Sequence, residues 1–215
     1  MKKTTGIVTL FAAGALVTSA FASVPASQVN RLGADLTPVG AEKAGSGDIP
    51  AWTGGLPTVP SNVTYTPGDK LQNPFASDGI KFTITAANMG QYADQLSDGY
   101  KALLSAYPSY KMNVYQSRRS CAYPDSVYQA TRRNAEVGEL TAGGTGVSQA
   151  IMGFPFPIPN NALEVIWNHT LRFRSFKATR QFTAAAVTRS GEYTLQTVQD
   201  EAILQWSDPT KGSAE

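Results

Sequence analysis

The sequence predicts an α+β protein in which helices cover a curved, incomplete antiparallel sheet. The last third, TLRFRSFKATRQFTAAAVTRSGEYTLQTVQDEAILQW, alternates polar and apolar residues with period two, as strands with one buried face do. Upstream, two segments show the three- and four-residue spacing of amphipathic helices. Meandering strands preceded by helices indicate an open half-barrel with an apolar concave face, which is the geometry of a container.

The first 22 residues have the pattern of a cleavable signal peptide of bacterial type. Lys2 and Lys3 precede the apolar run GIVTLFAAGALVTSAF, and Ala20-Phe21-Ala22 offers an A-x-A cleavage site. Without these two lysines the 18 basic residues fall to 16, which balance the 16 acidic ones. A neutral chain has no long-range attraction to nucleic acid. We therefore expect a periplasmic protein that does not bind nucleic acid.

Residues 23–76 are predicted to form an extended arm, because they are rich in Pro, Gly, Ser and Thr and have few apolar runs. The stretch PAWTGGLPTVPSNVTYTPGD contains four prolines and is typical of a segment that lies across a surface. Trp52 is the predicted anchor, since a buried tryptophan can hold an otherwise irregular segment. Residues 77–215 then form the helix-covered sheet.

A short strand is predicted over residues 80–85, IKFTIT, and the clearest helix of the chain follows it. Pro108 ends this helix. Its apolar positions recur at three- and four-residue steps: Met89, Tyr92, Ala93, Leu96, Tyr100, Leu103, Leu104 and Tyr107. Such an aromatic-rich stripe favours packing on a sheet, although a surface that faces lipid has the same pattern.

The next segments alternate strand, helix and loop. KMNVYQS, residues 111–117, has the period of a strand, and Pro124 with Asp125 begins a helix that runs to about Glu136. The glycine-rich LTAGGTGVS lacks the spacing and the Lys-Ser/Thr ending of a phosphate-binding loop, so we expect an ordinary loop.

The stretch from Gly153 to His169, GFPFPIPNNALEVIWNH, combines a stiff apolar ribbon with a helix. Its three alternate prolines fix the backbone and leave few amide donors. Asn161 is a suitable N-cap, and Glu164 three residues later completes a capping-box pattern. The ribbon is predicted to lie at the mouth of the half-barrel, where its aromatic residues either line a ligand site or fill the core. The predicted lining residues are Phe154, Phe156, Ile158, Ile166, Trp167 and Tyr100.

The chain contains one cysteine and one histidine, which excludes an internal disulfide and a zinc site made of Cys and His. Cys121 is interpreted as a small buried apolar residue rather than a nucleophile or an intermolecular bridge. His169 lies near the end of its helix beside Asn168 and Arg172, which favours a polar structural contact over acid-base catalysis. No acidic run resembles an EF-hand, and we expect no metal or cofactor.

The final strands form a hairpin in which Ser190-Gly191 makes a tight turn and Arg189 faces Glu192. After Trp206 the segment WSDPTKGSAE begins a turn, and no returning strand follows. We therefore expect the chain to be truncated at its C-terminus, with an unpaired strand edge.

Three segments resemble a proteobacterial periplasmic family known as domain of unknown function 1329, often labelled outer-membrane lipoprotein-sorting proteins. They are RLGADLTPVGAEKAGSGDIPAWTGG, YPSYKMNVYQSRRSCAYP and GFPFPIPNNALEVIWNHTLRFR, and the resemblance runs from about Val29 to Trp206. It implies a fold like that of the lipoprotein carriers LolA and LolB, an open β-barrel with helices as a lid. It also implies partners among RND/MMPL-type inner-membrane transporters and outer-membrane proteins. Family members are longer, so the chain corresponds to an N-terminal portion.

Two functions remain in view. The favoured one is a non-enzymatic carrier or adaptor for a hydrophobic ligand: a lipid, a lipoprotein acyl chain or a hydrocarbon-like compound. The alternative is a periplasmic hydrolase that uses carboxylates such as Glu164 or the Asp200/Glu201 pair. Each of these acids has a simpler predicted role, Glu164 as a helix cap and the other two as strand residues with solvated side chains. We therefore expect no catalytic residues.

Overall fold

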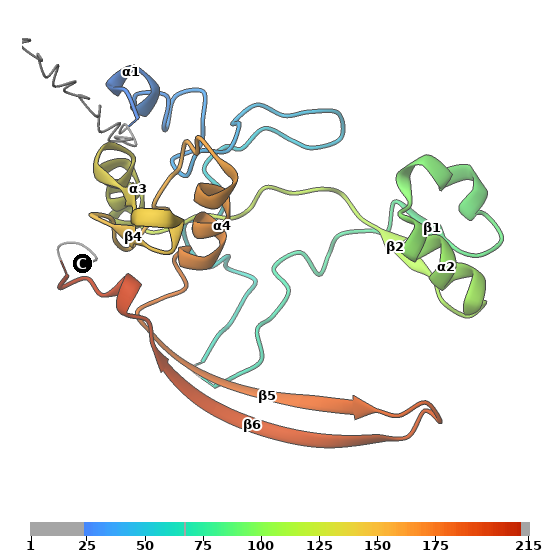
Figure 1. The fold of residues 1–215 in the computed structure, drawn as a ribbon. Helices are drawn as coiled ribbons and strands as arrows, with labels where there is room; N and C mark the ends of the chain where they lie inside the picture. The colour runs from blue at the N-terminus through green and yellow to red at the C-terminus, as the bar shows by residue number, and fades with distance from the viewer. Residues whose placement is uncertain (1–23, 67, 212–215) are drawn as a thin grey trace, which may run out of the picture.

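The computed structural model describes residues 24–66 and 68–211 (Figure 1). The predicted signal peptide, on which the periplasmic location depends, lies outside the described residues. The helices are α1 Ala26–Val29, α2 Asp98–Ala106, α3 Asp125–Val137 and α4 Ala162–Leu171, with 3-10 turns η1 Met89–Gln95, η2 Ala142–Gly144 and η3 Gln205–Ser207. The strands are β1 Phe82–Ile84, β2 Met112–Val114, β3 Glu139–Leu140, β4 Val147–Ser148, β5 Lys177–Val187 and β6 Tyr193–Ile203.

The named strands of the described residues form three separate antiparallel pairs: the hairpins β3–β4 and β5–β6, and β1–β2, whose strands are joined through η1 and α2. The described residues thus combine helices with antiparallel strands and contain no closed barrel. Within residues 24–66 and 68–211, these three sheets are not joined into the single curved sheet that the sequence predicts. An alternating pattern predicts that a segment is a strand, but it does not predict which strand lies beside it. Among the described strands, β5 and β6 pair only with each other.

The helix predicted from Met89 to Tyr107 is broken into η1 and α2. Leu96 has an extended backbone, and the Ser97 hydroxyl accepts a hydrogen bond from the Tyr100 amide at 3.4 Å, which caps α2. Part of the apolar stripe packs as expected, since Leu96 and Leu104 are buried with Ile84 of β1, whereas Tyr100 and Tyr107 are exposed. These elements form a small unit that lies apart from α3 and α4 (Figure 1).

The main body of the protein is built on α3, which lies where the sequence predicts it. Its residue Ala135 joins Val29, Leu32 and Leu36 of the arm in a buried apolar cluster. The glycine-rich segment beside it is not a plain loop, because its ends pair as the short strands β3 and β4. The three-residue turn η2 lies between these strands and keeps them in antiparallel register.

Three polar side chains bind the main chain of the proline-rich ribbon 153–159 and of Ile151 just before it. The buried Asn134 amide group donates to the carbonyls of Ile151 and Phe154 at 2.9 and 3.2 Å and accepts from the Ile151 amide at 3.1 Å. The Thr131 hydroxyl accepts from the Phe154 amide at 3.1 Å. Asn168 of α4 accepts from the Phe156 amide at 2.9 Å and donates to its carbonyl at 2.6 Å. These bonds replace the strand neighbours that the ribbon lacks.

Helix α4 begins with the capping arrangement that the sequence predicts. Asn161 accepts from the Glu164 amide at 3.0 Å, and the Glu164 carboxylate accepts from the Asn160 amide at 2.6 Å. Glu164 is buried by this role, with 6% of its surface exposed. Its carboxylate therefore serves as a helix cap.

The β5–β6 hairpin closes differently from the predicted turn. The Thr188 amide donates to the Glu192 carbonyl at 2.8 Å, so Thr188 and not Arg189 lies opposite Glu192. The predicted ion pair between Arg189 and Glu192 is not formed, because the loop is one residue longer than expected. Among the helices of the described part, none has the length and apolar character needed to cross a membrane.

Candidate ligand-binding pocket

An apolar pocket of about 280 Å³ lies between the arm and the segment that leads into α3. The arm contributes one wall and the 118–123 segment with Tyr128 of α3 contributes the other. The lining residues are Thr37, Pro38, Val39, Ala41, Trp52, Arg118, Arg119, Cys121, Tyr123 and Tyr128. Aromatic and aliphatic groups predominate among them, which is typical of sites for small apolar ligands.

Long-range hydrogen bonds fasten the arm over this pocket. The Trp52 indole N–H donates to the Cys121 carbonyl at 3.0 Å, which confirms Trp52 as an anchor. Arg119 donates to the carbonyls of residues 42, 43 and 44 at 2.6, 3.3 and 3.2 Å. The Leu56 amide donates to the Ser120 carbonyl at 2.8 Å. Because these partners lie far apart in the chain, the pocket exists only while the arm is docked.

The turn at residues 37–41 forms one end of the pocket. The buried Thr37 hydroxyl accepts from the Ala41 amide at 3.1 Å, and the Thr37 amide donates to the Ala41 carbonyl at 2.7 Å. Gly40 has a φ of +93°, and a Cβ on it would lie 1.7 Å from the Pro157 carbonyl oxygen. Only glycine therefore allows this turn to lie so close to the proline-rich ribbon.

Tyr123 connects the pocket to the core behind it. Its ring meets Tyr128, Phe154 and Phe173 edge-on, with centroid distances of 6.3, 5.8 and 6.3 Å. Burial raises the pKa of the Tyr123 phenol, which moves it further above neutral pH. The Tyr123 amide itself donates to the Tyr128 hydroxyl at 2.8 Å.

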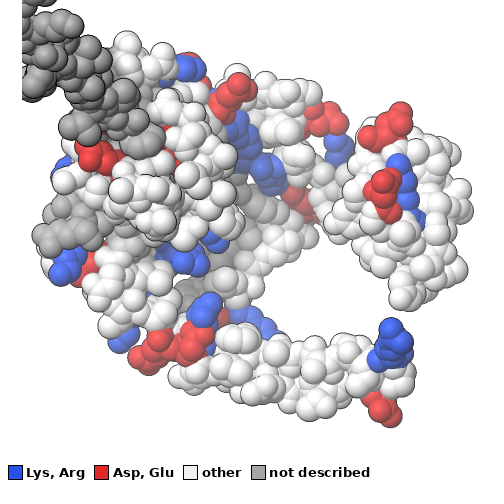
Figure 2. All heavy atoms as spheres, viewed as in Figure 1, with Lys and Arg blue, Asp and Glu red and all other residues white. Residues whose placement is uncertain are grey.

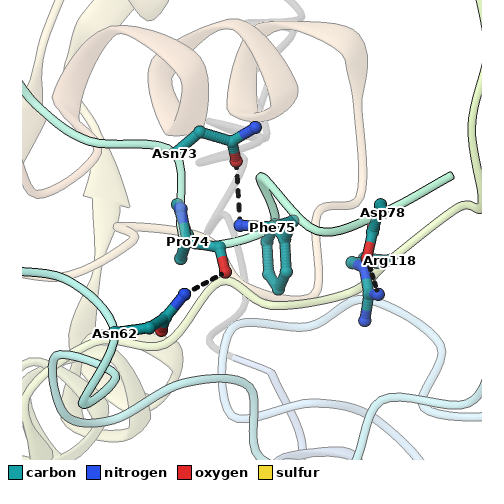
Figure 3. Close-up of polar contacts among 6 residues, drawn as sticks. All are labelled: Asn62, Asn73, Pro74, Phe75, Asp78 and Arg118. Atoms are coloured by element: carbon teal, nitrogen blue, oxygen red, sulfur yellow. Dashed lines mark hydrogen bonds and ion pairs between the residues drawn. The ribbon is translucent and has the colours of Figure 1, made fainter.

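The two arginines of the pocket wall already have partners. Arg118 donates to both carboxylate oxygens of Asp78, at 2.7 and 2.5 Å, and its guanidinium lies 4.5 Å from the centre of the Phe75 ring (Figure 3). Hydrogen bonds from Arg118 lower the pKa of Asp78, so the pair stays charged at neutral pH. Arg119 is bonded to three carbonyls of the arm. The charge of Arg118 is thus balanced by Asp78, whereas Arg119 keeps its positive charge and uses its donors to hold the arm.

Arg118 also separates this pocket from a more polar groove of about 350 Å³. Asn73, Phe75, Asp78 and Tyr115 are among the residues that line the groove. The loop that carries Phe75 is held by the Asn73 carboxamide, which accepts from the Phe75 amide at 2.9 Å, and by Asn62, which donates to the Pro74 carbonyl at 3.1 Å (Figure 3). The stacked Arg118 is therefore fixed from both sides.

Comparison with known proteins identifies the family. Residues 83–215 match the family model described as a protein of unknown function, DUF1329. The chain belongs to the DUF1329 family. It is 44% identical to the uncharacterized protein PA3922 of Pseudomonas aeruginosa over 199 residues, which are 91% of this chain and 43% of that relative. The chain thus spans less than half the length of this curated relative. No solved structure matches it.

The DUF1329 match includes only one wall of the pocket. Arg118, Arg119, Cys121, Tyr123 and Tyr128 lie inside the matched residues, whereas the arm residues precede them. The sequence prediction recognised Trp52 as an anchor but not as part of a lining. No local pattern connects Trp52 with Cys121, because 69 positions separate them.

The six predicted lining residues are not among those that line this pocket; five of them lie on the ribbon and on α4, which Asn168 joins, and Tyr100 lies on another unit. Phe154 contacts Tyr123 from behind, Phe156 is buried in the body, and Ile158 packs on the cluster around Val29. Trp167 is half-buried and donates its indole N–H to the Gly144 carbonyl at 3.0 Å. Ile166 is exposed, as is Tyr100 on the separate unit around α2. For Phe154 and Phe156, the core interpretation describes their surroundings better.

Cys121 and His169 also differ from expectation. Cys121 is exposed at the pocket, so the prediction of a buried residue is wrong. Its burial was inferred from residue type, whereas its carbonyl is used to hold Trp52 and its side chain is left at the surface. His169 is exposed, and its polar contact is made by the main chain: Arg172 donates to the His169 carbonyl at 2.5 Å.

The carboxylates considered for a hydrolase are not brought together. Asp200 accepts both hydrogen bonds of Arg180, at 2.9 and 2.5 Å, while Glu201 lies 3.9 Å from the Lys177 ammonium group. As neighbours on one strand, Asp200 and Glu201 point to opposite faces of the hairpin. Glu164 caps α4. Within the described residues, no three His, Cys, Asp or Glu side chains form a group suited to a metal ion.

Proposed function

We propose that the chain forms part of a periplasmic carrier or adaptor that binds a hydrophobic ligand in the pocket beneath the arm. The ligand class is a lipid, a lipoprotein acyl chain or a hydrocarbon-like compound. The observation that carries the proposal is the apolar lining around Val39, Trp52 and Tyr123. The Arg118 charge is balanced by Asp78, and the Arg119 guanidinium donates to carbonyls of the arm, so the apolar side chains are the main feature of the lining that supports a hydrophobic ligand.

The size of the pocket limits what it holds. Ligand sites usually measure about 300–1,000 Å³, and this pocket of about 280 Å³ lies at the lower end. One ring or a short stretch of an acyl chain fits such a volume, and a longer ligand extends beyond it. The neutral Tyr123 phenol offers one hydrogen bond to a carbonyl or ester oxygen of the bound group.

The proposal also includes a more specific fold. An open half-barrel of the LolA/LolB type agrees with the long curved β5–β6 hairpin (Figure 1), which would form one wall of it. The resemblance in the sequence supports export to the periplasm and partnership with an RND/MMPL-type transporter and an outer-membrane protein. Adaptor and carrier roles are compatible, since a carrier has to dock where it receives its ligand.

Val39→Arg is expected to weaken binding of an apolar probe to the pocket. The substitution puts a charged, bulky side chain into the lining, and burying an unpaired charge is costly. Titration with the dye N-phenyl-1-naphthylamine is the measurement. Wild type should enhance dye fluorescence saturably, and Val39→Arg should raise the dissociation constant by about tenfold or more, which corresponds to a loss of about 1.4 kcal/mol.

Val59→Arg is the matched control, because Val59 is an exposed residue of the same arm outside the pocket lining. It should bind the dye like wild type. If both arginine variants bind the dye equally well, the dye site lies elsewhere and the proposal fails. Circular dichroism of both variants excludes unfolding as the reason for lost binding.

A further inference from the structure

The groove beside the apolar pocket is richer in polar groups than the pocket is. The two cavities, of about 350 and 280 Å³, share Arg118 as a lining residue. In the groove, Tyr115 and Gln116 are exposed, so a ligand can reach the hydroxyl of one and the carboxamide of the other. Asn73 uses its side-chain oxygen to hold the Phe75 amide, which leaves its NH₂ group as a donor. A molecule that occupies both cavities therefore needs an apolar part and a polar part.

Arg118 lies at the junction of the two cavities, and one edge of its guanidinium group has no partner. Its Nε and Nη2 atoms donate to the two carboxylate oxygens of Asp78 at 2.7 and 2.5 Å. Because the guanidinium is a planar fork with five N–H donors, the two N–H groups of Nη1 lie on the edge away from this carboxylate. Within residues 24–66 and 68–211, Nη1 makes no hydrogen bond. The Arg118 side chain is 38% exposed, so an acceptor on a ligand can reach this edge.

The charges at this junction favour an uncharged acceptor. Asp78 balances the positive charge of Arg118, and a carboxylate bound to Arg118 would also be repelled by Asp78. Over the described residues of the face shown in Figure 2, basic and acidic side chains are interspersed and neither sign forms a large patch. A carbonyl oxygen accepts a hydrogen bond from the free edge of Arg118 without adding a second negative charge.

We propose that the two cavities together bind an uncharged acylglycerol, which is a glycerol ester of a fatty acid. The acyl chain lies in the pocket beneath the arm, and the ester carbonyl accepts a hydrogen bond from Nη1 of Arg118. The glycerol hydroxyls bind the polar side chains of the groove. The order of these parts agrees with the molecule, because its ester group lies between the apolar chain and the hydroxyls. This inference rests on the proposed function, since it needs a pocket that binds apolar groups.

Displacement of N-phenyl-1-naphthylamine from the wild-type protein tests the proposal with three probes that share one ten-carbon acyl chain. They are 1-decanoylglycerol, methyl decanoate and decanoate. The glycerol hydroxyls make the first probe more soluble in water than methyl decanoate, so burial of apolar surface alone would favour the methyl ester. We nevertheless expect 1-decanoylglycerol to bind with a dissociation constant about tenfold lower than that of methyl decanoate. Equal or weaker binding of 1-decanoylglycerol would overturn the proposal, as would tightest binding of decanoate, which would indicate an anion site at Arg119.

A double variant tests whether the groove holds the glycerol group. Tyr115→Phe combined with Gln116→Ala removes a hydroxyl and a carboxamide from two exposed residues of the groove. It should raise the dissociation constant of 1-decanoylglycerol about tenfold and leave that of methyl decanoate within about twofold. The matched control is Tyr107→Phe combined with Gln91→Ala, since both residues are exposed and neither lines a cavity described above. If the two double variants bind 1-decanoylglycerol equally well, the groove does not bind the glycerol group.

The same titrations separate failure of this proposal from failure of the pocket. If wild type does not bind the dye saturably, the pocket beneath the arm is not a ligand site and both proposals fail. If the dye and methyl decanoate bind but the glycerol group adds no affinity, the apolar pocket remains and the acylglycerol proposal alone is wrong.

Discussion

Asn134→Ala is expected to lower the free energy of unfolding by about 3 kcal/mol, because it leaves two main-chain groups without hydrogen-bond partners and removes a buried side chain. The Asn134 side chain is 1% exposed and makes all its bonds to residues Ile151 and Phe154. Alanine leaves the Phe154 carbonyl and the Ile151 amide without these partners, and it leaves a cavity, whereas the Ile151 carbonyl keeps its bond from the Gly153 amide at 2.7 Å. Urea denaturation followed by circular dichroism measures the change.

Gln129→Ala is the control for helix propensity and for loss of an amide side chain. Gln129 lies exposed on the same helix, α3, so its removal should change stability by less than about 0.5 kcal/mol. Similar small losses for both variants would show that the ribbon does not depend on Asn134. A large loss of stability for Asn134→Ala alone would support the view that the Asn134 side chain holds the ribbon in place.

Gly40→Ala is expected to detach the arm turn from the ribbon and so to destroy the end of the pocket. The backbone of Gly40 has a φ of +93°, which costs a non-glycine residue about 1–3 kcal/mol. The added Cβ would also lie 1.7 Å from the Pro157 carbonyl oxygen, a distance that forces the two segments apart. The free energy of unfolding measured in urea should fall by more than backbone strain alone explains, and the variant should not bind the dye.

Gly33→Ala separates these two causes. Gly33 lies in the same arm with a φ of +88°, but no atom lies within 4 Å of the position of its Cβ. Gly33→Ala should therefore lose only the free energy that the left-handed backbone conformation costs. The free energy of unfolding of Gly40→Ala should be lower than that of Gly33→Ala by about 2 kcal/mol or more. Equal stabilities would mean that the arm turn does not press on Pro157.

Local signals explain most of what the sequence predicted correctly. The cap formed by Asn161 and Glu164 depends on residues three positions apart, and α3 depends on its own periodicity after Pro124. The break at Ser97 was missed because the apolar spacing continues through it. The spacing of apolar residues shows only which face of a helix is apolar. It does not show that the Ser97 side chain binds the main chain and begins a new helix at that point.

The pocket could not be predicted in this way. It joins the Val39 turn to Tyr123 and Trp52 to Cys121 across long stretches of chain, and no periodicity encodes such contacts. For Phe154 and Phe156, the sequence pattern was compatible with two different roles. Their apolar character is equally suited to a lining and to a core, and the choice is made by Asn134 and Asn168, which bind the ribbon into the body.

Native mass spectrometry of the protein purified from the periplasm of a bacterial host tests the central claim most directly. The protein should retain an apolar small molecule, seen as a mass adduct that organic solvent releases. Val39→Arg should lack the adduct, and Val59→Arg should keep it. A bare protein mass for wild type, or an adduct retained equally by Val39→Arg, would contradict ligand binding in the pocket beneath the arm.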